Sequence, residues 1–399
     1  MPQTKSQPKN WQKVKLGEVV SINPDSVGKD FTFEQILYTD ISSVGTGISD
    51  APTEIPLSDA PSRARRLVKD GDTILSTVRP NRRSFLYLKE PEENRVVSTG
   101  FAVLRAGDKI DSRFLYYLVS NQPFTDYLTL HAKGAAYPAI DEDIIANADV
   151  VLPELNDQKQ IADVLSTYDD LIENNTKRIK VLEEMAQAIY KEWFVYFRFP
   201  GHEKVKMIDS KTEFGKIPEG WKIKNLGQVS ENYDSKRRPI SKMKREEIRG
   251  DIPYYGAAKI IDYVNNHIFD GKYLLMAEDG SVITKSGNPV LQFVNEKFWA
   301  NNHTHILRGR EVTTEYLYLS LIQFPIQGYI TGVAQPKINQ DNLNRIPILV
   351  PENEIAQKFD GLVESTFEDA WKLKEIVIKL SKARDLLLPK LVNGEIEVR

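Results

Sequence analysis

One short stretch in the second half of the chain carries carboxylates beside a lysine. "LLMAEDGSVITK" places Glu278 and Asp279 before a glycine turn, with Lys285 further on, and superficially resembles a nuclease strand. A nuclease strand carries an acid-x-Lys pair, and this pair is missing. The pattern therefore favours a hydrogen-bonded turn over a nuclease centre.

A second stretch, "ANNHTHIL", carries two histidines. Because side chains alternate along a strand, His303 and His305 would share one face, as two metal ligands can. No third ligand stands at a telling spacing. We therefore favour an ordinary strand pair over a metal site, and assign no residue to metal binding.

Other catalytic signatures are missing from the sequence. There is no G-x-x-x-x-G-K-[ST] phosphate loop and no glycine-rich dinucleotide fingerprint. The Asn/Asp-Pro-Pro-aromatic motif of methyl transfer is also missing, since Asn288-Pro289 lacks the second proline and the aromatic residue. We expect no catalytic residue and no cofactor bound by this chain.

Two basic clusters, by contrast, are suited to DNA. Arginine and lysine pair with guanine, asparagine and glutamine pair with adenine, and phosphates are held by basic and hydroxyl groups. Basic runs are also common in solvated loops, and that interpretation stays open for either cluster alone. The predicted DNA-binding residues of the clusters are Arg63, Arg65, Arg66, Arg79, Asn81, Arg82 and Arg83, then Lys236, Arg237, Arg238, Lys242, Lys244 and Arg245.

A third candidate is the proline turn in "VAQPKINQDNL", where Gln335, Lys337 and Asn339 are predicted to contact DNA. A similar stretch, "AAYPAIDEDII", stands 198 residues earlier. Loops on a rigid scaffold can vary without refolding the domain. Four positions are identical between the two copies: Ala136 and Ala334, Pro138 and Pro336, Ile140 and Ile338, Asp143 and Asp341.

The similarity extends along the chain and indicates a tandem repeat. "WQKVKLGEV" matches "WKIKNLGQV", and "FAVLRAGDKIDSRFLYYLV" matches "HTHILRGREVTTEYLYLSL". After each proline turn, a short apolar run ending in Pro-Glu precedes a long helical pattern. Runs such as "DTILSTV", "FLYL", "KYLLMA" and "VLQFV" are typical of short strands. Each copy is therefore predicted to be a compact α/β domain.

Two long helices carry alternating spacings of three and four between their apolar residues, which is a heptad seam with Asn175 as a polar member. A helix of about 35 residues is roughly 50 Å long. We predict that the two helices pair as an antiparallel coiled coil, rather than packing separately on their own domains. The predicted seam includes Ile172, Asn175, Ile179, Leu182, Ile189, Leu373, Val377, Leu380 and Leu387.

The predicted fold is therefore a pseudo-twofold α/β tandem repeat of two similar domains that alternate with two long helices. "RFPGHEKVKMIDSKTEFGKIPEGW" is interpreted as the link into the second repeat. The predicted segments are residues 1–153 (first α/β domain), 154–208 (first helix and linker), 209–351 (second α/β domain) and 352–399 (second helix).

Composition agrees with a globular protein, at 41% hydrophobic and 27% charged residues. Cysteine is absent, which excludes disulfides and thiolate zinc sites. No apolar run is long enough for a membrane span, and the amino terminus lacks a signal-peptide core, so a cytoplasmic location is expected. With a net charge of −3, any nucleic-acid surface must be a local patch.

The whole chain resembles the specificity subunit of type I restriction-modification enzymes. The resemblance lies in "GDTILSTVRPN", "IPYYGAAKIIDYVNNHIFDGKYLLMAEDGS", "VAQPKINQDNL" with "ILVPENEIAQKF", and "LLLPKLVNGEI". It covers nearly the full length. "AAYPAIDEDII" departs from the polar pattern of the second copy at Tyr137 and Ala139.

The resemblance implies a non-catalytic subunit whose two domains each read one half of a split, asymmetric double-stranded DNA target. It implies docking to two methyltransferase subunits and to restriction/translocase subunits. S-adenosylmethionine, ATP and Mg would be bound by those partners. The helices would set the gap between the half-sites.

Two other functions remain open from the residues alone. One is a scaffold of two α/β modules that binds protein or RNA, which would lack a salt-dependent preference for one duplex sequence. The other is a stand-alone nuclease, which magnesium and plasmid DNA would reveal.

Overall fold

The structure is a computed structural model that describes residues 10–134, 137–332 and 335–398. Within the repeated proline motif, Ala135, Ala136, Val333 and Ala334 lie outside the described residues. The chain forms two compact units, Met1–Asn174 with Val377–Arg399 and Asn175–Ile376. The division passes through both long helices, so each unit holds part of each. The predicted segments divide the chain between domains and helices rather than by compact unit, and their boundaries stay predictions.

The first unit is built on two four-stranded sheets, ordered β2-β9-β6-β7 and β4-β3-β8-β5, and a two-stranded β1-β10 pair. Its strands are β1 (Gln12–Lys15), β2 (Val20–Ile22), β3 (Gln35–Thr39), β4 (Thr53–Pro56), β5 (Ala64–Leu67), β6 (Thr73–Ser76), β7 (Phe85–Tyr87), β8 (Arg95–Ser98), β9 (Phe101–Ala106) and β10 (Asp149–Leu152). Its helices are α1 (Ser112–Ser120), α2 (Gln122–His131), α3 (Glu142–Ala146) and the first part of α4 (Leu155–Tyr190).

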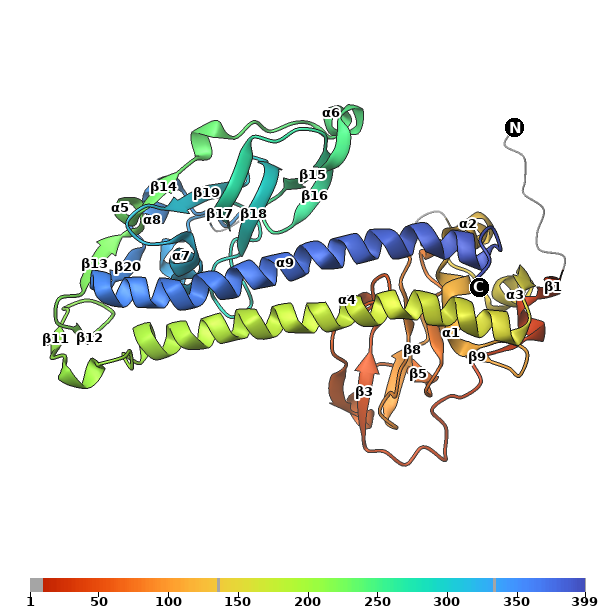
Figure 1. Ribbon diagram of the computed structural model, residues 1–399. Coiled ribbons are helices and arrows are strands. Elements are labelled where there is room, and N and C mark those ends of the chain that lie inside the picture. The colour runs from red at the N-terminus through yellow and green to blue at the C-terminus, as the bar shows by residue number, and fades with distance from the viewer. Residues whose placement is uncertain (1–9, 135–136, 333–334, 399) are drawn as a thin grey trace. The chain divides into compact units, whose positions relative to one another are not determined.

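The second unit contains a six-stranded sheet, ordered β14-β19-β17-β18-β15-β16, and the pairs β13-β20 and β11-β12 (Figure 1). Its strands are β11 (Met207–Asp209), β12 (Lys216–Pro218), β13 (Lys222–Asn225), β14 (Ser230–Asn232), β15 (Arg249–Tyr255), β16 (Ile260–Val264), β17 (Phe269–Ala277), β18 (Leu291–Ala300), β19 (Thr304–Gly309) and β20 (Pro347–Val350). Its helices are α5 (Leu226–Val229), α6 (Lys242–Glu247), α7 (Thr314–Leu321), α8 (Gln340–Asn344) and the first part of α9 (Asn353–Val392).

The two units repeat one topology, which confirms the predicted tandem α/β organisation. The order β2-β9-β6-β7 corresponds to β14-β19-β17-β18, and β1-β10 corresponds to β13-β20. The helix after the matched strand begins with a side-chain cap in both copies. The Asp111 carboxylate accepts from the Phe114 N–H at 2.9 Å, and the Thr313 hydroxyl accepts from the Tyr316 N–H at 3.2 Å.

Matched apolar residues form the two main cores. Leu16 and Leu226 are both fully buried, and the matched Leu104 and Leu307 are at most 1% exposed. The repeated sequence pattern therefore reports the same buried positions twice. The predicted linker adds to the second core, because it forms the β11-β12 hairpin and buries Trp221.

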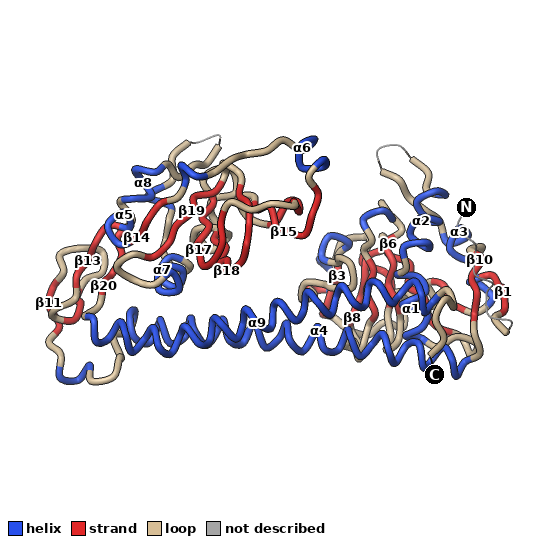
Figure 2. The backbone as a smooth tube through the Cα atoms, turned by 45° about the horizontal axis from the view of Figure 1, so that its top comes forward, coloured by secondary structure: helices blue, strands red, loops and turns tan. Residues whose placement is uncertain are grey.

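Within each unit, the α4 and α9 ribbons run side by side (Figures 1 and 2). In the first unit, Leu165 of α4 shares a core with Leu391 near the end of α9. In the second, Tyr190 at the end of α4 lies 6.2 Å, between ring centroids, from Phe359 near the start of α9. Early residues of one helix meet late residues of the other, so the pairing is antiparallel, as predicted. All nine predicted seam residues named above are buried or half-buried.

Among the described residues, no helix has the length and apolar character that a membrane span requires.

Candidate nucleic-acid interface

The two proline turns pair with the ends of matched strands. In the first unit, Ile140 N–H donates to the Thr77 carbonyl at 2.9 Å, and Arg79 N–H donates to the Pro138 carbonyl at 2.6 Å. In the second unit, Ile338 N–H donates to the Glu278 carbonyl at 2.9 Å.

The remaining contacts of the second unit complete this correspondence. Gly280 N–H donates to the Pro336 carbonyl at 3.1 Å. Isolated bridges join Val78 to Ala139 and Asp279 to Lys337. The stretches 77–79 and 278–280 are therefore structurally equivalent, and each is held against a proline turn.

Three predicted arginines of the first cluster lie on or beside β5. Arg63 binds the Asp40 carboxylate at 2.7 Å, and the exposed Arg65 donates to the backbone carbonyl of Ser62. Arg66 binds Glu142, just beyond the proline turn, at 3.0 Å. Glu142 thus connects the basic cluster to the proline turn of the first domain.

The other four predicted residues of this domain form the turn after β6. Pro80–Arg82 is a single 3-10 turn flanked by two left-handed residues, Arg79 (φ +50°) and Arg83 (φ +56°). Arg83 points inward, and its guanidinium donates to the Ser120 carbonyl at 2.8 Å. Asn81 and Arg82 are exposed. The turn therefore presents Asn81 and Arg82 to solvent and uses Arg83 to hold itself in place.

In the second domain, Arg237 is half-buried inside a polar network. Its guanidinium lies 2.6 Å from the Glu278 carboxylate and also donates to the Thr304 carbonyl at 2.8 Å. The other Glu278 oxygen lies 3.1 Å from the Lys337 ammonium. Glu278 therefore joins the second basic cluster to the second proline turn, as Glu142 does in the first domain.

The same network contains His305, which is 1% exposed. Its Nδ1 lies 2.5 Å from the Asp234 carboxylate, and its Nε2 lies 2.8 Å from the Ile338 carbonyl. Each ring nitrogen of the buried imidazole therefore has a polar partner. Burial by itself raises the pKa of the Asp234 carboxyl. The hydrogen bond and charge of His305, together with the Arg237 charge, outweigh this effect, so the pKa lies below its ordinary value of 3.8.

Ligand atoms of Asp234, Glu278 and His305 lie within 4.8 Å of one another, a spacing that a cation could use. The Arg237 guanidinium already contacts both carboxylates there. His303 is separate from this group and binds Asp279 at 2.8 Å. The two histidines that the sequence places on one strand therefore serve two different carboxylates.

The remaining predicted residues of the second cluster surround this network. Exposed side chains are those of Lys236, Arg238, Lys242 and Lys244. Arg245 is half-buried and binds Asp262 at 2.8 Å. Of the proline-turn residues, Gln335 and Lys337 are exposed, whereas the Asn339 side chain caps α8 by accepting from the Asn342 N–H at 2.8 Å. Their roles in DNA binding stay predictions.

Sequence reasoning missed two residues that organise these surfaces, Asp234 and Glu142, and treated Tyr137 only as a departure from the polar pattern of the second copy. The Tyr137 ring lies 4.2 Å from the Arg79 guanidinium and is 69% exposed. An aromatic residue directly before the proline, where the second copy has Gln335, was a signal that could have identified it.

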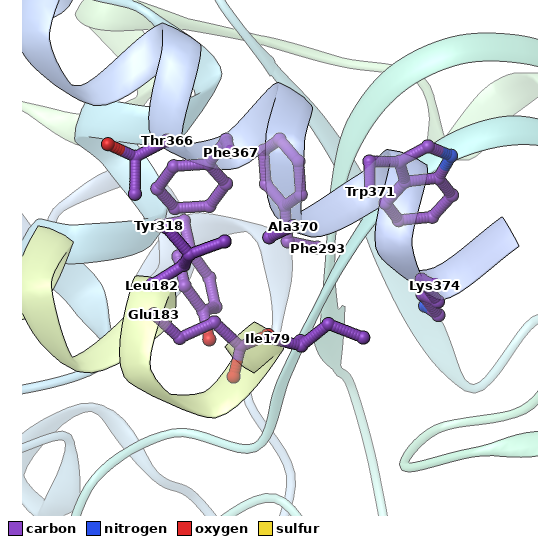
Figure 3. Close-up of a pocket in the computed structure, with 10 residues that line it drawn as sticks. All are labelled: Ile179, Leu182, Glu183, Phe293, Tyr318, Thr366, Phe367, Ala370, Trp371 and Lys374. Atoms are coloured by element: carbon purple, nitrogen blue, oxygen red, sulfur yellow. The ribbon is translucent and has the colours of Figure 1, made fainter. Parts of the chain in front are cut away.

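Away from the turns, a small pocket of the second unit opens between α4, α9 and the sheet (Figure 3). Phe293, Phe367 and Trp371 supply aromatic walls, and Glu183 and Lys374 are its charged lining residues. Burial raises the pKa of Glu183, while Lys374 opposes the shift. The pocket includes the predicted seam residues Ile179 and Leu182.

The chain is similar to proteins of one family. A family model described as "Type I restriction modification DNA specificity domain" matches residues 8–184 and 218–375. The chain is 28% identical over 317 residues to the "Type I restriction enzyme MjaIX specificity subunit" of Methanocaldococcus jannaschii, covering 75% of this chain and 72% of that one. It is 25% identical over 470 residues to the "Type I restriction enzyme HindI specificity subunit" of Haemophilus influenzae, covering 97% and 100%.

The fold has a counterpart among solved structures. The type I restriction-modification system S subunit from M. genitalium matches with a TM-score of 0.56 and 16% identity, over 98% of each chain. The two matched segments of the family model fall on the two repeats and together cover more than half of the sequence. The chain therefore belongs to the family of type I restriction-modification DNA specificity proteins.

Proposed function

We propose that this chain reads a bipartite, asymmetric double-stranded DNA target, one half-site per recognition domain. The observation that carries the proposal is the structural equivalence of the two turns, 77–79 and 278–280, each held against a proline turn beside basic residues. The side chains at these equivalent positions differ, with Arg79 in one domain and Gly280 in the other. Equal scaffolds with unequal side chains would read two different sequences.

The chain would act as a non-catalytic subunit. Two relatives that match most of this chain are named specificity subunits of type I restriction enzymes. Their names support the proposal that separate partner subunits perform the chemistry. We propose that two methyltransferase subunits bring S-adenosylmethionine, and that restriction/translocase subunits bring ATP and Mg. The missing phosphate loop and methyl-transfer motif agree with this division of labour.

The paired helices would set the gap between the half-sites. One heptad spans about 10 Å of helix, which corresponds to about three base pairs. Removing one heptad from both α4 and α9 should therefore shorten the gap and leave both half-site sequences unchanged. The removal of a heptad from one helix only is the control, because it breaks the pairing register. A gap that stays the same in an active double deletion would contradict the spacer role.

The direct test is methylation-sensitive sequencing of the source genome, with and without an in-frame deletion of this chain. We expect one split motif, with methylated adenine in each half, to lose its methylation. Restoring the intact gene should restore it. Unchanged methylation despite expression of the chain, together with no salt-dependent preference of the purified chain for any duplex, would favour the protein- or RNA-binding scaffold instead.

A further inference from the structure

His305 is a buried polar residue of the second domain. It belongs to β19, is 1% exposed, and has Met276 of β17 as its cross-strand neighbour. An unpaired polar group at such a position destabilises a fold, so buried polar side chains are normally hydrogen-bonded. The choice of partners therefore shows what a buried polar residue connects.

The two partners of His305 lie 104 residues apart in the chain. Its Nδ1 is hydrogen-bonded to the carboxylate of Asp234, which begins the 3-10 turn of the basic segment, residues 234–238. Its Nε2–H donates to the carbonyl of Ile338 in the proline turn, residues 335–339. One buried imidazole therefore joins the basic segment to the proline turn.

Each of these two segments is also held at a second point. The Ile338 N–H donates to the Glu278 carbonyl at 2.9 Å, so both backbone groups of this residue have partners. Further along the basic segment, the Trp299 indole N–H donates to the Arg238 carbonyl at 2.5 Å. With these attachments, the link through His305 fixes the spacing between the two segments.

A second link between the segments is closer to solvent. Glu278 bridges Arg237 and Lys337, and the Lys337 side chain is 47% exposed. Salt screens exposed ion pairs, and DNA phosphates compete with a carboxylate for exposed cations. Because His305 is shielded from solvent, its link does not depend on what occupies these cations.

The first domain is built differently at the equivalent position. Ala102 takes the place of His305 in the matched strand β9, and its methyl group can neither donate nor accept a hydrogen bond. There the basic cluster is joined to the proline turn by the Arg66–Glu142 ion pair, whose Glu142 side chain is 52% exposed. The buried histidine link is therefore a feature of the second domain.

Resting on the proposed function, we infer that His305 is a positioning residue for recognition of the second half-site. Being buried, it contacts no base. It holds the basic segment and the proline turn at the spacing at which their exposed side chains meet one stretch of duplex. Three of these predicted DNA-binding side chains are Lys236, Arg238 and Gln335. Recognition of the first half-site does not depend on His305.

The test measures binding of the full chain, together with the methyltransferase subunits of its own system, to three duplexes. One carries the target found by methylation sequencing, and the others carry that target with the first or the second half-site scrambled. His305→Leu fills the space but removes both hydrogen bonds, whereas His305→Gln keeps an amide N–H for one acceptor. Val294→Ala is the matched control, because Val294 is 1% exposed in β18 and contributes only apolar packing.

We expect His305→Leu to lose selectivity for the second half-site by about 10-fold, the size of effect of a lost buried hydrogen bond. Its selectivity for the first half-site should be retained. His305→Gln should regain part of the lost selectivity. Val294→Ala should keep both selectivities even where its thermal midpoint falls as far as that of His305→Leu.

Other outcomes overturn the inference in distinguishable ways. If folded His305→Leu keeps its selectivity for the second half-site, or loses selectivity for both half-sites equally, His305 has no local positioning role. If Val294→Ala loses as much selectivity at the same thermal midpoint, stability alone explains the loss and the inference fails.

A second variant covers the case in which His305→Leu does not fold. Asp234→Ala cuts the same link from the half-buried basic segment. Loss of selectivity for the second half-site alone supports the inference, and unchanged selectivity contradicts it. If the unmodified complex binds the scrambled duplexes as tightly as the intact target, the proposed function itself fails and the inference with it.

Discussion

At the scale of single residues, the clearest lesson comes from one dipeptide that both repeats share. Arg105 and Arg308 each follow a buried leucine in the matched strands β9 and β19. Arg105 binds the fully buried Asp72 carboxylate through two N–H groups, at 2.8 and 2.7 Å, and Asp25 at 2.6 Å. The hydrogen bonds from Arg105 and then Lys69 hold the pKa of Asp25 below its usual 3.8.

Arg308 has a different environment, because Tyr273 precedes Leu274 where Asp72 precedes Thr73 in the first domain. Arg308 is exposed and stacks on that tyrosine. The same residue type at the same strand position is therefore part of a buried ion cluster in one domain and of a surface stack in the other.

Replacement of these two arginines should have unequal effects on stability. Arg105→Ala removes the ionic partner of the fully buried Asp72 side chain, which then retains the hydrogen bond from the Lys69 N–H at 2.7 Å. We therefore expect a loss of about 3–5 kcal/mol in the free energy of unfolding. Arg308→Ala removes an exposed stack and should cost about 1 kcal/mol or less. Urea unfolding of the full-length variants measures both. Equal losses would show that the Asp72 cluster has no special role.

At the scale of elements, the heptad pattern identified both long helices and their antiparallel pairing. The pattern did not show that aromatic residues dominate one end. Phe194, in the π-helical turn Lys191–Val195, lies 4.7 Å from Phe359 of α9, between ring centroids, and 5.0 Å from Tyr316 of α7. Phe359 is fully buried.

This aromatic cluster predicts where α9 is most sensitive to truncation. Phe359→Ala should lower the free energy of unfolding of the second unit by about 3–5 kcal/mol, because it opens a cavity among rings. Leu362→Ala, on the same helix but half exposed, should change it by about 0.5 kcal/mol or less. Hydrogen exchange of α7 and α9 backbone amides would locate the effect. Similar protection in both variants would contradict this account.

At the scale of the whole molecule, the duplication places the two proposed DNA-reading surfaces in different parts of the chain. The structure shows which arginines of the two basic clusters are exposed and therefore suited to a test of this separation. Arg83 and Arg237 are bound to the protein itself, whereas Arg82 and Arg238 are exposed. Arg238 does donate to the Ser235 and Arg237 carbonyls, but its side chain remains on the surface.

We expect Arg82→Ala to weaken recognition of the first half-site only, and Arg238→Ala to weaken the second only. The physical reason is that each belongs to a different copy of the fold. The measurement is binding to duplexes in which one half-site at a time is scrambled. A variant that reduces selectivity for both half-sites equally would show that its arginine contributes a general charge rather than a local contact.

The sequence alone determined the tandem repeat, the long paired helices, the short strands around "DTILSTV" and "KYLLMA", and the proline turns. These follow from local pattern and from comparison of the chain with itself. It did not reveal β3, β5 and β8, or the pairing of β15 with β18, because their partners are distant in the chain and their apolar runs are short.

Only the tertiary structure decided which polar residues meet. Glu278 and Asp279 looked like a simple turn, yet Glu278 binds Arg237 and Lys337, which lie 41 and 59 residues away in the chain. His303 and His305 looked like a pair, yet each serves a different carboxylate. Periodicity reports which face of an element is buried, whereas side-chain partners depend on contacts between elements that are remote in sequence.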